Sequence, residues 1–232
     1  MKARKILVSL AALALVAAIS IGGTLAYLTS KTDTVTNTFT IGKVTITLDE
    51  TKVTPDGVKD ATATKRVTEN SYKLMPGHEY MKDPAVTIKA DSEPAYVRML
   101  VTVSDMAKLQ AAFPEAKYAD FYTTVNGEKV FLLEKLVGGW NSAVWAPAGY
   151  ANGTYEFRYV GTAAPAENTE GVLVDTMLPA LFTSVNLPTT VDKDALDNLN
   201  GIDIKIIAEA IQADGLTAEQ AWGELNTTYH GN

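Results

Sequence analysis

Apolar and polar residues alternate with a period of two in several short segments of this chain. The alternation is regular in residues 44–48 and 202–211, and β-branched and aromatic residues dominate residues 96–103. Successive side chains of a β-strand point to opposite faces of a sheet, so the pattern predicts strands that bury one face. Because such strands recur at short spacing, we expect a mainly β fold, an antiparallel β-sandwich.

Turn residues separate the expected strands. Asn126-Gly127 and Asn152-Gly153 suit two-residue hairpin turns, because both residue types tolerate a positive φ angle. Residues 51–71 are polar and contain Pro-Asp-Gly, which predicts a turn and a loop that could include a weak strand. Residues 130–136, after the first Asn-Gly pair, are expected to form a strand.

A few helices are expected between the strands. Residues 106–113 carry apolar residues at helical spacing behind a Ser-Asp cap, and residues 217–222 follow a capping threonine. Residues 191–199 contain aspartates that could cap one or two helical turns. The sequence therefore predicts two or three short helical insertions in the sandwich.

The parity of each expected strand assigns one set of side chains to the core. A slip of one residue would reverse the face of every side chain in a strand, so each assignment depends on the register. The residues expected to be mostly buried are Phe39, Ile41, Val44, Ile46, Leu48, Tyr96, Leu100, Phe131, Leu133, Phe157, Ile204 and Ile206.

Residues 1–26 have the composition of a secretory signal peptide, with positive charges in the first five positions. Residues 6–21 form an uncharged apolar run. As a helix this run would rise about 24 Å, less than the hydrocarbon core of about 30 Å, which favours cleavage over an uncleaved anchor. Thr24 and Ala26 are the small residues that a signal peptidase recognises, so we expect the mature chain to begin at Tyr27.

A second apolar run does not follow in the sequence. We therefore expect secretion of a mature chain, 27–232, that forms a single β-sandwich domain with no stable membrane anchor after cleavage.

The chain has 20 Lys and Arg residues against 27 Asp and Glu, a net charge of −7, which disfavours nucleic acid as a partner. There are no cysteines, which excludes disulfides and thiolate metal sites.

The sequence offers no complete catalytic or metal-binding motif. His78-Glu79 resembles the start of a zinc-protease helix, but Lys82 stands where the second histidine is needed. The only other histidine is His230. We expect no enzymatic activity, no bound metal and no cofactor.

Region 140–159 is rich in aromatic residues. Alternating aromatics on a hairpin usually form the core of a sandwich, and this is the favoured interpretation. The alternative is an exposed platform that stacks on sugar rings or on peptide. The candidate ligand-binding residues are Trp140, Trp145, Tyr150 and Tyr155.

The junction between the signal and the first strands is more specific. Residues 22–31, GGTLAYLTSK, and residues 37–49, NTFTIGKVTITLD, resemble the TasA/camelysin family of Gram-positive exported proteins. Residues 74–78, LMPGH, and residues 86–90, VTIKA, are similar to a turn and a strand end of the same family. The resemblance covers about the first 100 residues, and the rest agrees only in its strand-rich pattern.

The resemblance implies a jelly-roll sandwich and export through a dedicated ER-type signal peptidase. Matrix-forming members assemble into fibres in which the N-terminal strand of one subunit completes the sheet of the next. Residues 27–41 would be that strand here, with Val35, Phe39 and Ile41 setting its register. The same strand could instead fold back into its own subunit and leave a monomer, and the sequence does not favour either outcome.

These observations favour a secreted structural or adhesive protein of the cell surface or biofilm matrix. Its expected partners are the signal peptidase and then further copies of itself or other matrix components. The alternative function is an extracellular module that binds a glycan or a protein through region 140–159. The protease activity described for camelysin is not expected, because the zinc motif is incomplete in this sequence.

Overall fold

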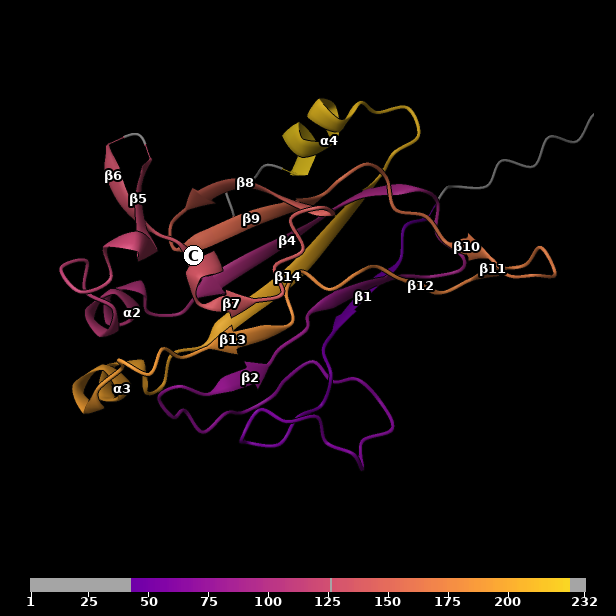
Figure 1. Cartoon of the computed structure of the whole chain (residues 1–232). Helices are drawn as coiled ribbons and strands as arrows, with labels where there is room; N and C mark the ends of the chain where they lie inside the picture. Colours follow the sequence, from indigo (N-terminus) through magenta and orange to yellow (C-terminus); the bar gives the residue numbers. More distant parts are fainter. Residues whose placement is uncertain (1–42, 126, 226–232) are drawn as a thin grey trace, which may run out of the picture. The chain divides into compact units, whose positions relative to one another are not determined.

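A four-stranded antiparallel sheet, in the order β14-β4-β9-β8, lies at the centre of the fold (Figure 1). The computed structural model describes residues 43–125 and 127–225, which all belong to one compact unit. The four strands are β4 (Ala95–Val103), β8 (Trp145–Ala151), β9 (Thr154–Tyr159) and β14 (Ile204–Gln212).

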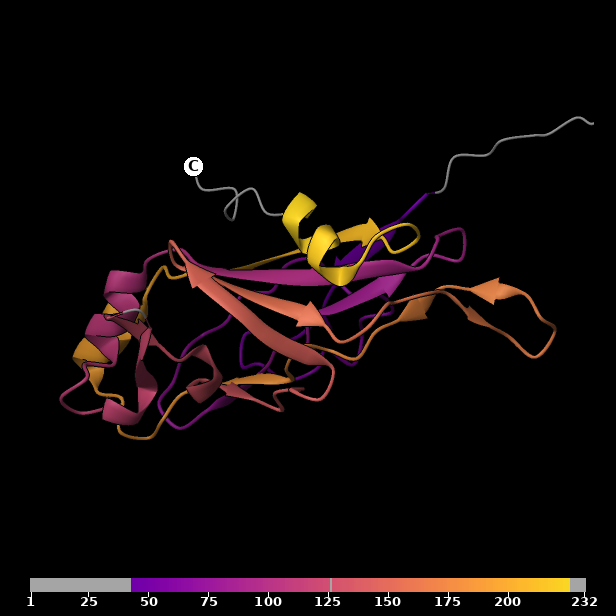
Figure 2. The ribbon, with the colours of Figure 1, turned by 90° about the horizontal axis from the view of Figure 1, so that it is seen from above.

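Two three-stranded antiparallel sheets and two hairpins complete the strands of the described chain. In Figures 1 and 2 the β5–β6 hairpin lies at one end of the central sheet, and the β10–β11 hairpin lies at the opposite end. One sheet has the order β1-β3-β12, with β1 (Ile46–Asp49), β3 (Ala85–Ile88) and β12 (Thr176–Met177). The other has the order β2-β13-β7, with β2 (Glu79–Met81), β13 (Ser184–Asn186) and β7 (Val137–Gly138). The hairpins pair β5 (Tyr122–Val125) with β6 (Glu128–Phe131) and β10 (Ala166–Glu167) with β11 (Leu173–Val174).

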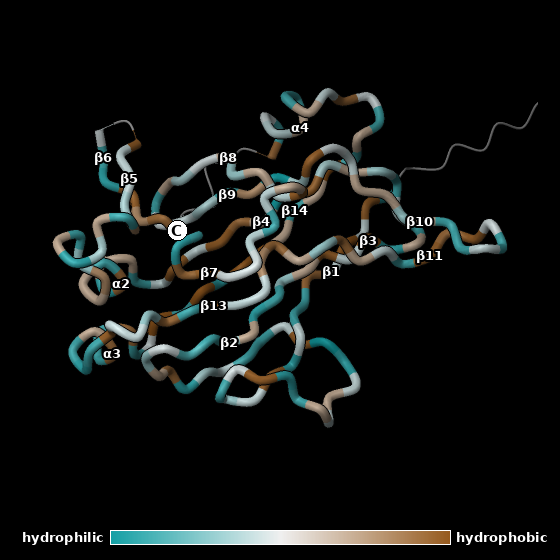
Figure 3. The backbone as a smooth tube through the Cα atoms, in the orientation of Figure 1, coloured by the Kyte–Doolittle hydropathy of each residue, from teal (hydrophilic) through white to brown (hydrophobic). Residues whose placement is uncertain are grey.

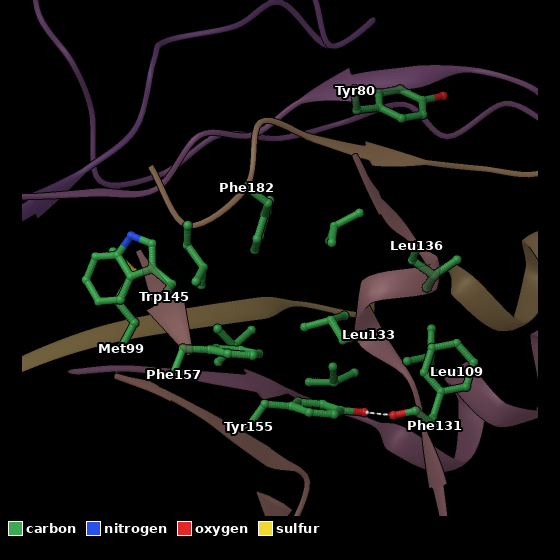
Figure 4. Packing of buried hydrophobic residues seen from close by; sticks show 14 of the residues in the cluster. Tyr80, Met99, Leu109, Phe131, Leu133, Leu136, Trp145, Tyr155, Phe157 and Phe182 are labelled. Atoms are coloured by element: carbon green, nitrogen blue, oxygen red, sulfur yellow. Dashed lines mark hydrogen bonds between the residues drawn. The ribbon is translucent and has the colours of Figure 1, made fainter. Parts of the chain in front are cut away.

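The main core lies against the face of β4 that carries its odd-numbered side chains. Figure 3 shows the long hydrophobic stretch of β4 in the middle of the fold. Met99 and Val101 are fully buried there, together with Trp145 and Phe157 of the neighbouring strands. Figure 4 shows Phe182, from the segment before β13, among these residues. Burial of this contiguous apolar cluster is the main contribution to stability.

The opposite face of β4 is covered by the C-terminal helix α4 (Ala218–Leu225). The ring of Trp222 packs 5.7 Å from that of Tyr96, and the guanidinium of Arg158 lies 4.8 Å from the Trp222 ring. Arg98, whose side chain is 1% exposed, binds Glu156, Glu209 and the carbonyl oxygen of Leu225. The helix therefore closes over a buried group of charges.

Capping residues define the helices as the sequence predicts. Asp105 accepts a hydrogen bond from the Lys108 amide at the start of α2 (Met106–Ala112). Asp192 does the same for Ala195 at the start of α3 (Lys193–Leu199). Thr217 and Gln220 exchange hydrogen bonds in a capping box before α4. Two short 3₁₀ turns cover Ala119–Phe121 and Leu133–Lys135.

The predicted mainly β, antiparallel fold with short helices is confirmed for the described residues. The hairpin at Asn152-Gly153 has two positive φ angles, 51° and 77°, as a type I′ turn requires. The predicted strand over residues 130–136 is wrong beyond Phe131, where a 3₁₀ turn follows. Leu133 and Leu136 are both buried, and their spacing of three residues places them on one face of such a turn.

The predicted burial is confirmed for part of the set, namely Leu100, Phe131, Leu133 and Phe157. Another part is only half-buried, namely Val44, Ile46, Leu48, Tyr96, Ile204 and Ile206. Phe39 and Ile41 lie outside the described residues. Several half-buried residues belong to β1 and β14, the strands that border the candidate site.

Candidate functional site

Strand β14 is an edge of the central sheet, with one side paired and the other side open. The backbone amides and carbonyls of its odd-numbered residues point toward β4. At the two ends of the ladder, the Asp203 carbonyl accepts from the Ser104 amide, and the Ala213 amide donates to the Pro94 carbonyl. The amides and carbonyls of its even-numbered residues therefore point away from β4. Among the described residues these groups have no hydrogen-bond partner. The open edge of β14 thus offers a row of unused backbone donors and acceptors.

A groove of about 1190 Å³ runs beside the first half of this edge. One wall is β14 with the end of α3, and the other is β1 with the loop that follows it. The floor consists of apolar residues from α2, the second 3₁₀ turn and β13. The apolar lining includes Leu48, Leu109, Phe113, Leu133, Leu136, Leu187, Leu199, Ile204 and Ile206.

The groove explains why predicted core residues are only half-buried. Ile204 and Ile206 point toward the core, as their parity predicts, but their flank toward β1 is open. Leu48 faces the same space from β1. These residues have the side chains of an interior strand and the exposure of an edge strand. The groove therefore has the lining expected where a further apolar strand would pack.

The two edges of the central sheet differ in how well they are protected against pairing with another chain. At the β8 edge, Pro147 lies within the strand and the register shifts between Pro147 and Gly149. Proline and bulges are the devices that prevent an edge strand from pairing with another chain. Strand β14 pairs with β4 over its whole length, Ile204–Gln212, without a bulge or a proline. Only the β14 edge is therefore suited to accept a further strand.

The far end of the groove is polar. Glu50 is 7% exposed and pairs with Lys82 at 2.7 Å, while Asn70 donates to its other oxygen at 2.9 Å. Tyr72 lies beside this group, and burial followed by the negative charge of Glu50 raises the pKa of its hydroxyl. The structure places these groups together from three segments of the chain.

A second ionic cluster fixes the loop after β1. Arg66 contacts Asp49 at 2.5 Å and Asp83 at 3.0 Å, and it also donates to the carbonyl oxygens of both residues. Burial alone would raise the pKa of Asp83, but hydrogen bonds from Thr51 and Arg66 together lower it. The predicted loop 51–71 is thus held in place by charge and backbone bridges rather than by a strand.

The aromatic residues of region 140–159 pack mostly into the protein. Trp145 is fully buried and its indole nitrogen donates to the carbonyl of Pro179 at 2.8 Å. Tyr155 is buried and donates to the carbonyl of Phe131 at 2.7 Å (Figure 4). Trp140 and Tyr150 are half-buried against Phe157 and Tyr155. These contacts agree with the favoured core interpretation, and the ligand platform stays a prediction.

His78 is exposed, and the residues after it form strand β2 rather than a zinc-protease helix. Within residues 43–125 and 127–225, no group of three His, Cys, Asp or Glu side chains is placed to hold a metal ion. The predicted signal-peptidase residues Thr24, Ala26 and Tyr27 lie outside the described residues. The same holds for Val35, Phe39 and Ile41 of the predicted donor strand.

No family model, curated protein or solved structure matches this chain. In the described part of the chain, no helix has the length and apolar character needed to span a bilayer.

Proposed function

We propose that this chain is a secreted structural or adhesive protein of the cell surface or biofilm matrix, similar to the TasA/camelysin family. In this proposal it has a jelly-roll sandwich, and the N-terminal strand of residues 27–41 is donated to a neighbouring subunit. The observation that carries the proposal is the open edge of β14 beside a groove whose lining next to that edge includes the apolar side chains of Ile204 and Ile206. Such an edge is completed by β-strand addition, in which backbone hydrogen bonds supply affinity and alternate side chains supply register.

The lengths of the two elements support this pairing. Fifteen extended residues, 27–41, span about 50 Å, whereas the nine residues of β14 span about 30 Å. Lys43 accepts from the Glu93 amide, next to Pro94 at the C-terminal end of β14. The groove borders the opposite, N-terminal half of β14. The strand is therefore long enough to reach either its own groove or that of a neighbour.

The first experiment compares the mature protein with a variant lacking residues 27–36, by negative-stain microscopy over time. We expect filaments from the intact protein only, while the deletion variant stays folded and monomeric. A synthetic peptide of residues 27–41 should bind the deletion variant one to one and stop filament growth. Equal assembly by both proteins contradicts strand donation, and a monomeric intact protein with a protected groove indicates that the strand folds back.

A second experiment tests the acceptor edge itself. Ile206→Pro removes an amide that faces the groove and leaves the ladder to β4 intact. The matched control, Ile206→Ala, loses the apolar side chain but keeps that amide. Assembly should be lost in Ile206→Pro and retained in Ile206→Ala, with circular dichroism confirming that both are folded. Normal assembly of a folded Ile206→Pro protein contradicts the proposed edge.

A further inference from the structure

Three side chains of different chemistry meet at one carboxylate at the polar end of the groove. Glu50 follows β1, Asn70 belongs to the loop before β2, and Lys82 follows β2. One oxygen of Glu50 lies 2.7 Å from the Lys82 amine, and the other lies 2.9 Å from the Asn70 amide nitrogen. The side chains of Glu50 and Lys82 are only 7% and 11% exposed. The amine of Lys82 and the carboxamide of Asn70 are thus both hydrogen-bonded to the Glu50 carboxylate, which can accept a proton, and the group is largely shielded from water.

The Asn70 carboxamide is also polarised. Its oxygen accepts a hydrogen bond from the Val53 amide at 3.0 Å, and its nitrogen donates to Glu50 and to the Thr51 carbonyl. A backbone amide aimed at this oxygen stabilises the negative charge that forms when the carbonyl carbon is attacked. The carboxylate next to the nitrogen can deliver a proton to it as it leaves.

We propose that Lys82 and Asn70 join in an intramolecular isopeptide bond, with Glu50 carrying the proton. Glu50 takes a proton from the Lys82 ammonium, and the free amine attacks the Asn70 carbonyl carbon. A carbon–nitrogen bond to Lys82 forms and the bond to the Asn70 amide nitrogen breaks. Glu50 returns the first proton to the Asn70 nitrogen and then relays to it the second proton, which the Lys82 nitrogen loses as it becomes an amide nitrogen, so that ammonia leaves in its protonated form. One ammonia leaves, and neither an oxidant nor an external reactant is needed.

Other lysines in the described chain lack this combination. The pairs Lys43–Asp91, Lys129–Glu115 and Lys193–Asp197 are exposed on both sides. The partially buried pair of Lys82 and Glu50 lies beside Tyr72. The Tyr72 hydroxyl donates to the carbonyl of Met81, the residue before Lys82. Burial together with the charge of Glu50 raises the pKa of that tyrosine, which agrees with a dry, negatively charged site.

The bond would tie the loop after β1 to β2 in a chain that has no cysteines for disulfides. It would fix one wall of the groove covalently. Like other cross-links, it would also stabilise the fold by restricting the unfolded chain. The bond does not depend on assembly, so its test is separate from the tests of the proposed function.

The experiment is mass spectrometry of the purified mature protein and its tryptic peptides. The intact chain should weigh less than its sequence by the mass of one ammonia. Trypsin should release one branched peptide, in which residues 67–73 are joined to residues 74–89, because cross-linked Lys82 is not cleaved. Lys82→Arg and Glu50→Gln should both have the full mass, and Lys73→Arg, a neighbouring exposed lysine, should keep the loss.

Two outcomes would overturn the proposal. The first is a wild-type chain of full mass with cleavage after Lys82. The second is a mass loss that persists in Lys82→Arg, since this indicates a succinimide at Asn70-Ser71 rather than a cross-link. Both readouts use the covalent mass, so they remain decisive for a variant that folds poorly.

Discussion

Replacing Arg98 by methionine should destabilise the protein more than any exposed charge change. Arg98 contacts Glu209 at 2.6 Å and Glu156 at 3.2 Å beneath α4, and its side chain is 1% exposed. Methionine matches the aliphatic part of the arginine side chain, so the change removes the guanidinium group with its charge and hydrogen bonds while the packing of the aliphatic part remains. Two carboxylates then lose the cation that lies between them in a region of low dielectric constant.

The magnitude follows from what each carboxylate retains. Removing one partner of a buried ion pair costs about 3–5 kcal/mol. Glu156 keeps Arg158, at 2.8 Å, and Glu209 is 18% exposed, so water can solvate part of its charge. We therefore expect a loss at the lower end, about 3 kcal/mol. With a urea m-value of at most about 3 kcal/mol per molar, the unfolding midpoint should fall by at least about 1 M.

The assay is urea unfolding of the mature protein, followed by tryptophan fluorescence and far-UV circular dichroism. Arg158→Met is the matched control, because Arg158 binds the same carboxylate and is 31% exposed, and it should cost only about 1 kcal/mol. Lys193→Met, which breaks an exposed pair, should leave the midpoint unchanged. Adding Glu156→Gln and Glu209→Gln to Arg98→Met should restore part of the loss. A midpoint for Arg98→Met within error of that of Arg158→Met would refute the reasoning.

The other predictions concern a hydrogen bond, pH and processing. Tyr155→Phe leaves the buried Phe131 carbonyl without its donor and should cost about 1–2 kcal/mol in the same assay, whereas a neutral result contradicts that role. The pKa of Asp83 is lower in the folded protein than in the unfolded chain, where it is about 3.9. The Asp83 carboxylate therefore stabilises the fold at pH values above about 3.9, and this contribution is lost as the pH falls through the pKa of the folded state. The stability difference between wild type and Asp83→Asn should therefore shrink between about pH 5 and pH 2, and a difference that stays constant with pH would exclude this linkage. N-terminal sequencing of secreted material should give Tyr27 or a residue within two positions, and recovery of the full-length chain in membranes would contradict cleavage.

Local signals in the sequence were sufficient to predict the elements that local chemistry controls. The Asn152-Gly153 turn, the Asp105 cap and the capping box at Thr217 all follow from residues within a few positions of one another. The alternation in residues 202–211 also predicted β14 and its inward face. Each of these features depends on backbone geometry that the residue types themselves favour.

The groove and the charge clusters could not be predicted in the same way, because they depend on which strands become neighbours. Arg98 interrupts the apolar segment 96–103, and this was a signal that the second face of that strand is also covered. Nothing near it in the sequence indicates Glu209, which is more than a hundred positions away and reaches Arg98 only through the β14–β4 register. The same applies to Glu50 and Lys82, each of which follows a different strand.

An open edge on one side of the sheet has a consequence for how subunits could associate. If each subunit offers one donor strand and one acceptor edge, the contact joins two different surfaces, and repeated contacts give an open, unbranched filament rather than a closed dimer. The Pro147 bulge at β8 would prevent sheets from joining at their second edge, so growth would be limited to one direction. Replacing Pro147 by threonine should then change filament morphology toward lateral aggregates, while single filaments identical to wild type would show that the β8 edge is blocked in another way.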